Sequence, residues 1–313
     1  MTHMTTLSGD DLGALCFGTM QFGQGSDEAV SQDIYKACRA AGIRHFDTAW
    51  VYTKGNSERF LGQFVQEERD RVFIASKVGY SDGAGASNLT PHLTESLKRL
   101  DIDQIDLLYL HRFDPNTPLI ETLTWFAEQQ KQGLIRYIGL SNFAAWQIVM
   151  AQNILESLGT RVDAVQPMYS LVKRQAEVEI FPACEALGIS CFSYSPLGAG
   201  LLTGKYFRAE TASGRLADNA RYAQRYHLES MHKTAADLVE LSAAFEQSPA
   251  TLAISWIRQT QFAPTPIISA RTMEQLAPLL AAQQVTLTAD QFAQVSEVSV
   301  SPPPATDRLE EAV

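Results

Sequence analysis

Short apolar runs alternate with amphipathic stretches along almost the whole chain. Several of the apolar runs are hydrophobic nearly throughout, which is typical of strands covered on both faces, and the stretches between them follow helical periodicity. The apolar runs predict eight β-strands, at residues 14–20, 44–49, 72–77, 105–111, 135–141, 162–167, 189–196 and 265–269. Eight strands alternating with helices predict an α/β fold with an all-parallel sheet.

The segments between the apolar runs carry signals for the ends of helices. The sequence SDE at residues 26–28 opens a helix that Gly42 ends, and Asn56 or Ser57 is expected to cap the next helix. Pro91 is expected in the first turn of a third helix, because proline fits that turn without losing a hydrogen bond.

A closed barrel and an open Rossmann sheet both satisfy this alternation. A Rossmann sheet carries a GxGxxG turn directly after its first strand, whereas the first strand here ends in FGTMQFG. The nearest imitation begins only at Gly198 and has the wrong final spacing. We therefore predict a (β/α)8 TIM barrel that forms a single domain over residues 1–313, with an extra C-terminal helix near 288–299.

Composition and charge exclude several classes of protein. The chain has 313 residues, of which 45% are hydrophobic, and this is enough for one large barrel core. Its net charge of −10 disfavours nucleic acid as a partner, because phosphate binding needs a cationic surface. No apolar run approaches 18 residues, and the first residues lack the features of a secretory signal. We therefore expect no membrane partner and a cytoplasmic location.

The cysteines give no sign of a metal site or a disulfide framework. Cys16, Cys38, Cys184 and Cys191 form no CxxC pair, so free buried thiols and no structural zinc are expected.

Polar residues stand at the C-terminal ends of six consecutive predicted strands. They are Asp47, Lys77, His111, Ser141 with Asn142, Gln166, and the run Ser193-Tyr194-Ser195. Each has an ordinary structural explanation when taken alone, such as a turn cap, a surface lysine or a buried histidine. In barrel enzymes the reacting groups come from this end of the strands. Six such ends in succession therefore predict a functional site.

Tyr52, five residues after Asp47, completes a set suited to protonating a carbonyl oxygen. A free tyrosine has a pKa near 10, which is too high for acid catalysis at neutral pH, and a neighbouring ammonium lowers it. The Asp47 carboxylate would keep Lys77 charged, and His111 would orient the substrate oxygen. The set has no nucleophile with an adjacent base, so hydride transfer from a cofactor suits it better than acyl transfer.

A metal-dependent hydrolase barrel is an alternative with less support. His45 and Asp47 lie two residues apart on one strand and could share a face as ligands. Such sites need further histidines or carboxylates at strand ends, and only His111 is present. Lys77 would also repel the cation.

Five blocks of the sequence resemble the aldo-keto reductase family. GIRHFDTAWVYTKGNSERFLG is similar to the family signature, and RLDIDQIDLLYLH, IRYIGLSNF, VQPMYS and SYSPLGAGLLTGKY are similar to later blocks, in order, from about Gly18 to Leu276. The resemblance implies a barrel that binds NADPH, with NAD less favoured, and reduces aldehydes or ketones reversibly. A redox-sensing subunit on the same fold, resembling potassium-channel β subunits, is the alternative function. The resemblance gives no oligomeric state.

The resemblance also implies roles for individual residues. The catalytic tetrad consists of Asp47, Tyr52, Lys77 and His111, with Tyr52 as the general acid. The implied cofactor contacts are Thr19, Met20 and Asp47; Ser141, Asn142 and Gln166 at the carboxamide; Tyr194 against the nicotinamide ring; Ser195, Pro196, Leu197 and Gly198 at the phosphates; and Lys205 and Arg215.

The last block, PIISARTMEQLAPLL, is similar to the family segment that binds the adenosine 2′-phosphate. Ser269, Arg271 and Gln275 are suitably placed, and arginine is a strong phosphate ligand. The Glu-Asn pair that meets the adenine in the family is replaced here by Pro278-Leu279.

Two further expectations concern the substrate and a long polar segment. Trp50, Met20, Tyr80 and Phe113 follow strand ends and could form an apolar wall of a substrate pocket, although core packing would explain each equally well. The polar segment at residues 208–226 is long for a loop, and we hypothesise that it folds over the cofactor.

Overall fold

The structure is a computed structural model that describes residues 3–208, 214–308 and 310. The described chain forms two compact units. The first comprises residues 1–167, 183–192 and 267–276, and the second comprises residues 168–182, 193–266 and 277–313, without the residues excluded above.

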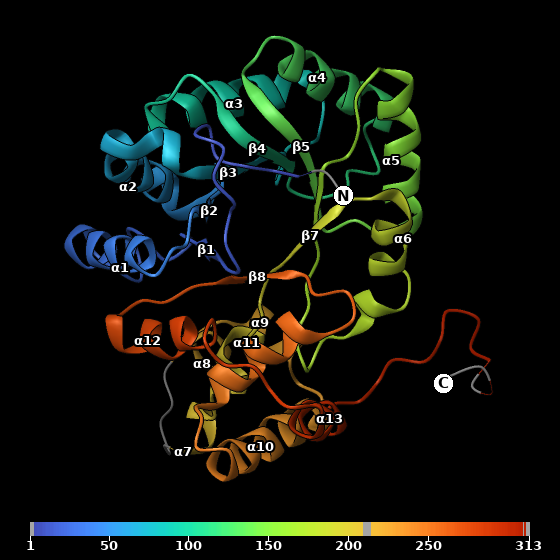
Figure 1. Cartoon of the computed structure of the whole chain (residues 1–313). Helices are drawn as coiled ribbons and strands as arrows, with labels where there is room; N and C mark the ends of the chain where they lie inside the picture. Colours follow the sequence, from blue (N-terminus) through green and yellow to red (C-terminus); the bar gives the residue numbers. More distant parts are fainter. Residues whose placement is uncertain (1–2, 209–213, 309, 311–313) are drawn as a thin grey trace. The chain divides into compact units, whose positions relative to one another are not determined.

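Eight parallel strands close into a barrel, which confirms the predicted (β/α)8 fold (Figure 1). Each strand neighbours the next in sequence, and β1 also pairs with β8, Cys16 opposite Ile267 and Phe17 opposite Ile268. Each strand overlaps the predicted run. They are β1 (Cys16–Gly18), β2 (His45–Asp47), β3 (Phe73–Val78), β4 (Ile105–Leu110), β5 (Ile135–Ser141), β6 (Ala164–Gln166), β7 (Ser190–Ser193) and β8 (Thr265–Ile268).

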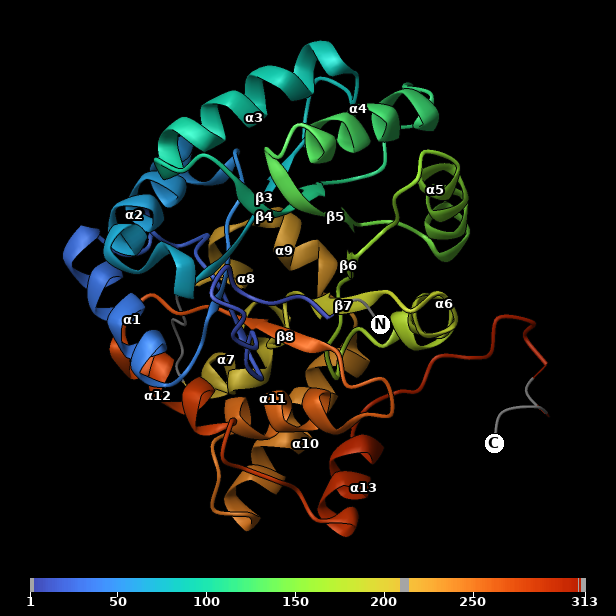
Figure 2. The same ribbon diagram turned by 45° about the horizontal axis from the view of Figure 1, so that its top comes forward.

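Helices α1 to α5 follow one another around the strands of the first unit (Figure 2). Their apolar faces are buried, as expected for helices covering a parallel sheet. The elements are α1 (Glu28–Ala40), η1 (Tyr52–Gly55), α2 (Asn56–Val65), η2 (Gln66–Arg71), α3 (Ala86–Leu100), α4 (Leu119–Lys131) and α5 (Ala145–Ser157); α6 (Ile180–Leu187) and α12 (Met273–Ala281) each contribute to both units.

Two of the expected helix starts are wrong. Asn56 and Ser57 do not cap α2: Gly55 precedes the helix with a φ of 91°, and no side chain caps it. Pro91 lies in the interior of α3, because that helix begins at Ala86. By contrast, Asp27 caps α1 as predicted from the SDE sequence, and its Oδ1 accepts a hydrogen bond of 2.9 Å from the Val30 amide.

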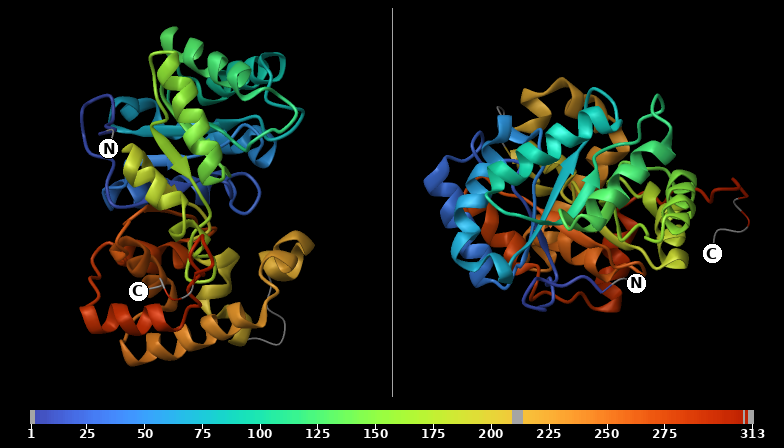
Figure 3. Two further views of the ribbon diagram at one scale, coloured as in Figure 1. Left: turned by 90° about the vertical axis from the view of Figure 1, so that its right-hand side faces the viewer. Right: turned by 90° about the horizontal axis from the view of Figure 1, so that it is seen from above.

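The second unit contains a helical layer around Trp256, which is buried. The indole stacks on Tyr169 at 5.6 Å, and its Nε1 donates to Ser296 Oγ at 2.8 Å. The left view of Figure 3 shows the helices of this unit. Its elements are η3 (Gln175–Glu177), η4 (Gly198–Thr203), α7 (Lys205–Arg208), α8 (Arg215–Asp218), α9 (Ala220–Arg225), α10 (Glu229–Ala244), α11 (Pro249–Gln259) and α13 (Ala289–Glu297), the last of which is the predicted C-terminal helix.

Other expectations from the sequence can be compared with the described residues. No helix within them is long and apolar enough to cross a membrane. All four cysteines are free, as predicted, although Cys191 is partly exposed rather than buried. The segment predicted to fold over the cofactor lies partly outside the described residues, at 209–213, and its remainder forms α8 and α9.

Candidate active site

The first three strand-end residues lie close together at one end of the barrel. Asp47 is the last residue of β2, Lys77 is the penultimate residue of β3, and His111 directly follows β4. All three are buried, and their exposed fractions are 3%, 1% and 7%. In a parallel barrel the C-terminal strand ends share one rim, so neighbouring strands place these side chains next to one another.

Lys77 and Asp47 form a buried ion pair. The Lys77 ammonium contacts Oδ1 of Asp47 directly and donates to the Thr48 carbonyl at 2.7 Å, while Gln166 Nε2 donates to Asp47 Oδ2 at 2.8 Å. Burial alone would lower the pKa of Lys77, but the charges of Asp47 and Tyr52 outweigh it and raise that pKa above its usual value. Burial raises the pKa of Asp47, opposed by Lys77 and Gln166. Lys77 is therefore charged at neutral pH.

Tyr52 lies beside this ammonium at the start of a tight turn. Lys77 Nζ is 4.9 Å from the centroid of the Tyr52 ring and hydrogen-bonds the tyrosine. Two of the next residues, Thr53 and Lys54, adopt left-handed backbone conformations with φ of 46° and 56°. The Tyr52 ring is partly exposed and meets His111 edge to face at 5.9 Å.

His111 is an uncharged hydrogen-bonding group at neutral pH. Burial lowers its pKa well below the usual range, and the positive charges of Lys77 and Arg112 lower it further. Its buried Nδ1 has no hydrogen-bond partner among the described residues. The Tyr80 ring, one member of the expected pocket wall, lies 4.8 Å from the imidazole.

The residues expected at the nicotinamide carboxamide are joined to one another and to the tetrad. Ser141 Oγ donates to the Gln166 carbonyl at 3.1 Å. Asn142 has a φ of 60°, and its Nδ2 donates to the His111 carbonyl at 2.9 Å and to Ser141 Oγ at 3.1 Å. Asn142 is exposed, whereas Ser141 and Gln166 are buried.

The Thr19 hydroxyl is bound by the protein itself. Thr19 is fully buried, and its Oγ1 lies 2.7 Å from Ser57 Oγ and donates to the Asp47 carbonyl at 3.1 Å. Ser57 is in turn hydrogen-bonded to Thr48 at 2.8 Å. The sequence singled out Ser57 only as a helix cap and not as a partner of Thr19, although its place in the signature-like block could have suggested such a role. Met20, by contrast, is partly exposed.

The segment after β8 places Ser269, Arg271 and Gln275 together. Arg271 Nε donates to Gln21 Oε1 at 2.8 Å, and the Arg271 amide donates to Gln275 Oε1 at 3.0 Å. Ser269 Oγ is buried and has no partner in the described part of the chain. Sequence reasoning did not identify Gln21, whose only signal was its position in FGTMQFG, directly after the first strand.

The second unit holds the other expected cofactor residues. Tyr194 pairs with Met168, and the Tyr169 amide donates to its carbonyl at 3.2 Å. A turn begins at Ser195, ends at Gly198 and contains Pro196 and Leu197. Ser195 has a φ of 58° and Gly198 a φ of 55°, and the Gly198 amide donates to the Ser195 carbonyl at 2.9 Å.

Lys205 and Arg215 lie on the neighbouring short helices α7 and α8. The Lys205 ammonium is 4.8 Å from the Tyr206 ring, and the Tyr206 hydroxyl accepts a hydrogen bond of 3.2 Å from the Leu216 amide, next to Arg215. In the Pro278-Leu279 pair, Leu279 is only 2% exposed and therefore packs in the interior.

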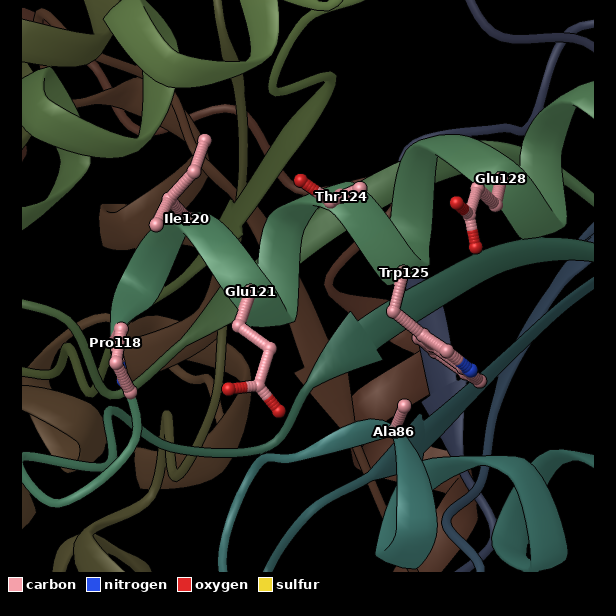
Figure 4. Close-up of a pocket in the computed structure, with 7 residues that line it drawn as sticks. All are labelled: Ala86, Pro118, Ile120, Glu121, Thr124, Trp125 and Glu128. Atoms are coloured by element: carbon pink, nitrogen blue, oxygen red, sulfur yellow. The ribbon is translucent and has the colours of Figure 1, made fainter.

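One surface pocket lies away from all of these residues (Figure 4). It lies over α3 and α4 and contains no residue of the predicted site; its lining is Ala86, Pro118, Ile120, Glu121, Thr124, Trp125 and Glu128. Within the described ranges, no group of three or more histidine, cysteine, aspartate or glutamate side chains could hold a metal ion.

Comparison with known proteins identifies the family. The family model for the aldo/keto reductase family matches residues 14–300, and this chain belongs to that family. It is 33% identical to the uncharacterized oxidoreductase YrpG of Bacillus subtilis, over 92% of each chain. It is 31% identical to human aflatoxin B1 aldehyde reductase member 2, over 87% of this chain and 82% of that protein.

A third relative carries a different description. A rice protein, a probable voltage-gated potassium channel subunit beta, is 30% identical over 96% of this chain and 97% of its own length. Family membership makes the present protein an oxidoreductase that acts on carbonyl groups.

Proposed function

We propose that the protein catalyses the reversible NADPH-dependent reduction of aldehydes and ketones, with Tyr52 as the general acid. The observation that carries this proposal is the position of the Lys77 ammonium, which contacts Asp47 and hydrogen-bonds Tyr52. A buried cation at this distance favours the phenolate form of tyrosine, so the hydroxyl becomes a better proton donor. We also propose that residues 1–313 act as one barrel domain in the cytoplasm.

Each tetrad residue has a separate task in this mechanism. When bound, NADPH supplies the hydride for the carbonyl carbon. Tyr52 gives its proton to the carbonyl oxygen, and the Lys77 charge stabilises the phenolate that remains. Asp47 holds Lys77 in place and offsets its charge. The neutral His111 hydrogen-bonds the substrate oxygen and aligns it with the Tyr52 hydroxyl. The His111 and Tyr52 rings are in edge-to-face contact.

The residues of the first unit suit a dinucleotide with a 2′-phosphate. The buried Ser269 hydroxyl has an unused hydrogen-bonding capacity, and the Arg271 guanidinium, fixed through Nε by Gln21, keeps its terminal amino groups for a phosphate. Asn142 and Gln166 offer amide groups beside the tetrad. We propose that these residues of the first unit hold NADPH in preference to NADH; the cofactor contacts expected in the second unit stay a prediction.

The decisive experiment follows NADPH oxidation at 340 nm with a panel of aldehydes and ketones, in parallel with NADH. Tyr52→Phe should lower kcat by about 10²- to 10⁴-fold, the usual contribution of a general acid. Its Kd for NADPH should stay within about twofold of the wild-type value. Tyr137→Phe is the matched control, because the ring of this β5 residue can still stack on Phe73 of β3. Wild-type turnover in Tyr52→Phe would show that the proton comes from elsewhere.

A redox-sensing subunit is the second candidate, and it is favoured by the likeness to the rice channel-subunit protein. In that case the protein would bind NADPH tightly, release it slowly and turn over none of the carbonyl compounds. Single-turnover oxidation of bound NADPH, together with its dissociation rate, separates the two functions.

A further inference from the structure

Arg99, on helix α3, reaches the backbone of the turn that carries Tyr52. We call residues 50–55 the Tyr52 turn. Arg99 Nη1 donates to the carbonyl of Trp50 at 2.9 Å, and Nε donates to Glu95 at 2.9 Å. The arginine side chain is 13% exposed. Arg99 thus binds the backbone of Trp50, which lies 49 positions earlier in the sequence and two residues before Tyr52.

Glu58 holds Arg99 from the buried side. Its carboxylate is fully buried and lies 3.2 Å from Arg99 Nη1. The other carboxylate oxygen accepts a hydrogen bond of 2.8 Å from Ser76, the neighbour of Lys77 in β3. The ion pair therefore connects α2, α3 and the strand that carries the catalytic lysine.

The Trp50 side chain and backbone are fixed on several sides. The indole stacks on His92 with ring centroids 3.6 Å apart, and the Arg99 guanidinium lies 5.6 Å from the indole. The Trp50 amide donates to the Lys77 carbonyl at 3.1 Å. Both backbone polar groups of Trp50 are thus bound, one by the lysine strand and the other by Arg99.

Arg99 also fills the space beneath the far end of the turn. Gly55 has a φ of 91°, and a Cβ at this position would lie 2.7 Å from the Arg99 guanidinium carbon. Thr53 and Lys54 are left-handed as well. Such conformations persist only where the surroundings impose them. Arg99 supplies such surroundings at both ends of the turn.

We propose that the buried Glu58–Arg99 pair is a positioning device that holds the Tyr52 hydroxyl in register with Lys77. This inference rests on the proposed function. A buried ion pair contributes little net stability compared with apolar residues of similar volume. Its directional hydrogen bond to Trp50, by contrast, fixes the backbone that carries Tyr52. Neither residue touches the reacting atoms, so each acts through Tyr52.

The test compares Arg99→Met with Glu95→Gln, which removes only the more exposed partner of Arg99. Arg99→Met should lower kcat by about 10- to 100-fold, because a displacement of about 1 Å in a catalytic group has effects of this size. Its Kd for NADPH should stay within about twofold, and its kcat–pH profile should move as Tyr52 leaves Lys77. Arg99→Lys, which can still donate to Trp50, should recover part of kcat, and Glu95→Gln should behave as wild type.

Three outcomes would overturn the inference: wild-type kcat in folded Arg99→Met, an unchanged pH profile despite a lower kcat, or equal losses of turnover and NADPH affinity. If Arg99→Met does not fold, Glu58→Gln keeps the volume and weakens the hold on Arg99, and a wild-type kcat in that variant would count against the proposal. An inactive wild-type protein would instead refute the proposed function. The two failures are therefore distinguishable.

Discussion

Gln166 and Asp47, 119 residues apart in the sequence, are joined by a hydrogen bond of 2.8 Å from the glutamine amide to the carboxylate. Gln166 is also a predicted contact of the nicotinamide carboxamide. One side chain thus connects the proposed cofactor site to the Lys77–Asp47 ion pair, so cofactor binding and proton transfer should respond together when it is changed.

Replacement of Gln166 by leucine should therefore weaken NADPH binding and lower kcat together, each by about 10-fold, as expected for the loss of a hydrogen bond to a charged group. Gln129→Leu is the matched control, because this buried glutamine of α4 donates to the Trp125 carbonyl at 3.3 Å and is not among the predicted site residues. Fluorescence titration and steady-state kinetics measure the two effects. A change in binding alone would show that Gln166 does not support Asp47.

Lys77→Met should abolish most turnover and destabilise the protein. It removes the ammonium that offsets a fully buried Asp47 carboxylate. Breaking a buried ion pair in this way costs about 3–5 kcal/mol, because one charge stays uncompensated. The double variant Asp47→Asn with Lys77→Met should regain part of the loss in free energy of unfolding. Urea denaturation measures the free energy of unfolding of the single and the double variant. A double variant no more stable than Lys77→Met would contradict the ion pair between Lys77 and Asp47.

Acid should destabilise the fold through His45. Its ring lies between Phe73 and Phe192, 1% exposed, and burial, followed by the Lys77 charge, lowers its pKa to about 3. The unfolded chain, with an ordinary histidine pKa near 6.5, binds the proton first as the pH falls. The free energy of unfolding therefore keeps its full value above pH 6.5 and declines by about 1.4 kcal/mol per pH unit between pH 6.5 and pH 3.

The measurement is the free energy of unfolding in urea at pH 7 and pH 5. His45→Phe should reduce the difference between the two by about 2 kcal/mol. His227→Asn, a substitution at an exposed position, is the matched control. If His45→Phe keeps the full difference, the acid sensitivity arises from other groups.

Arg271→Ala should weaken NADPH binding by about 10- to 100-fold, as expected for a charge-assisted hydrogen bond, and leave NADH binding nearly unchanged. The physical reason is that only NADPH carries the 2′-phosphate. Gln21→Ala, which removes the partner of Arg271 Nε, should have a smaller effect in the same direction. Equal losses for both dinucleotides would place Arg271 elsewhere on the cofactor.

The sequence predicted the eight strands because each is a local signal, a short apolar run, and six of these runs end in a polar residue. It also predicted that Asp47, Lys77 and His111 lie close together, since neighbouring parallel strands must bring their C-terminal ends together. The start of α2 after Gly55 and the start of α3 at Ala86 were missed, because Gly55 is a left-handed glycine without a capping side chain and Pro91 is accommodated within α3.

Long-range side-chain partners could not be predicted in the same way. The bonds of Arg99 to Trp50 and of Arg271 to Gln21 span 49 and 250 positions, and each depends on the angle at which a side chain leaves its helix or loop. No periodic pattern in the sequence encodes such angles. These contacts became visible only once the backbone was placed.

The pairing of β1 with β8 has a consequence for synthesis on the ribosome. Cys16 is added to the growing chain 251 residues before its partner Ile267. At about 5–20 residues per second, β1 must wait for roughly 12–50 seconds with one edge unpaired. An exposed strand edge can pair with another chain, so this interval is the time in which nascent chains are most open to misassembly and to capture by chaperones.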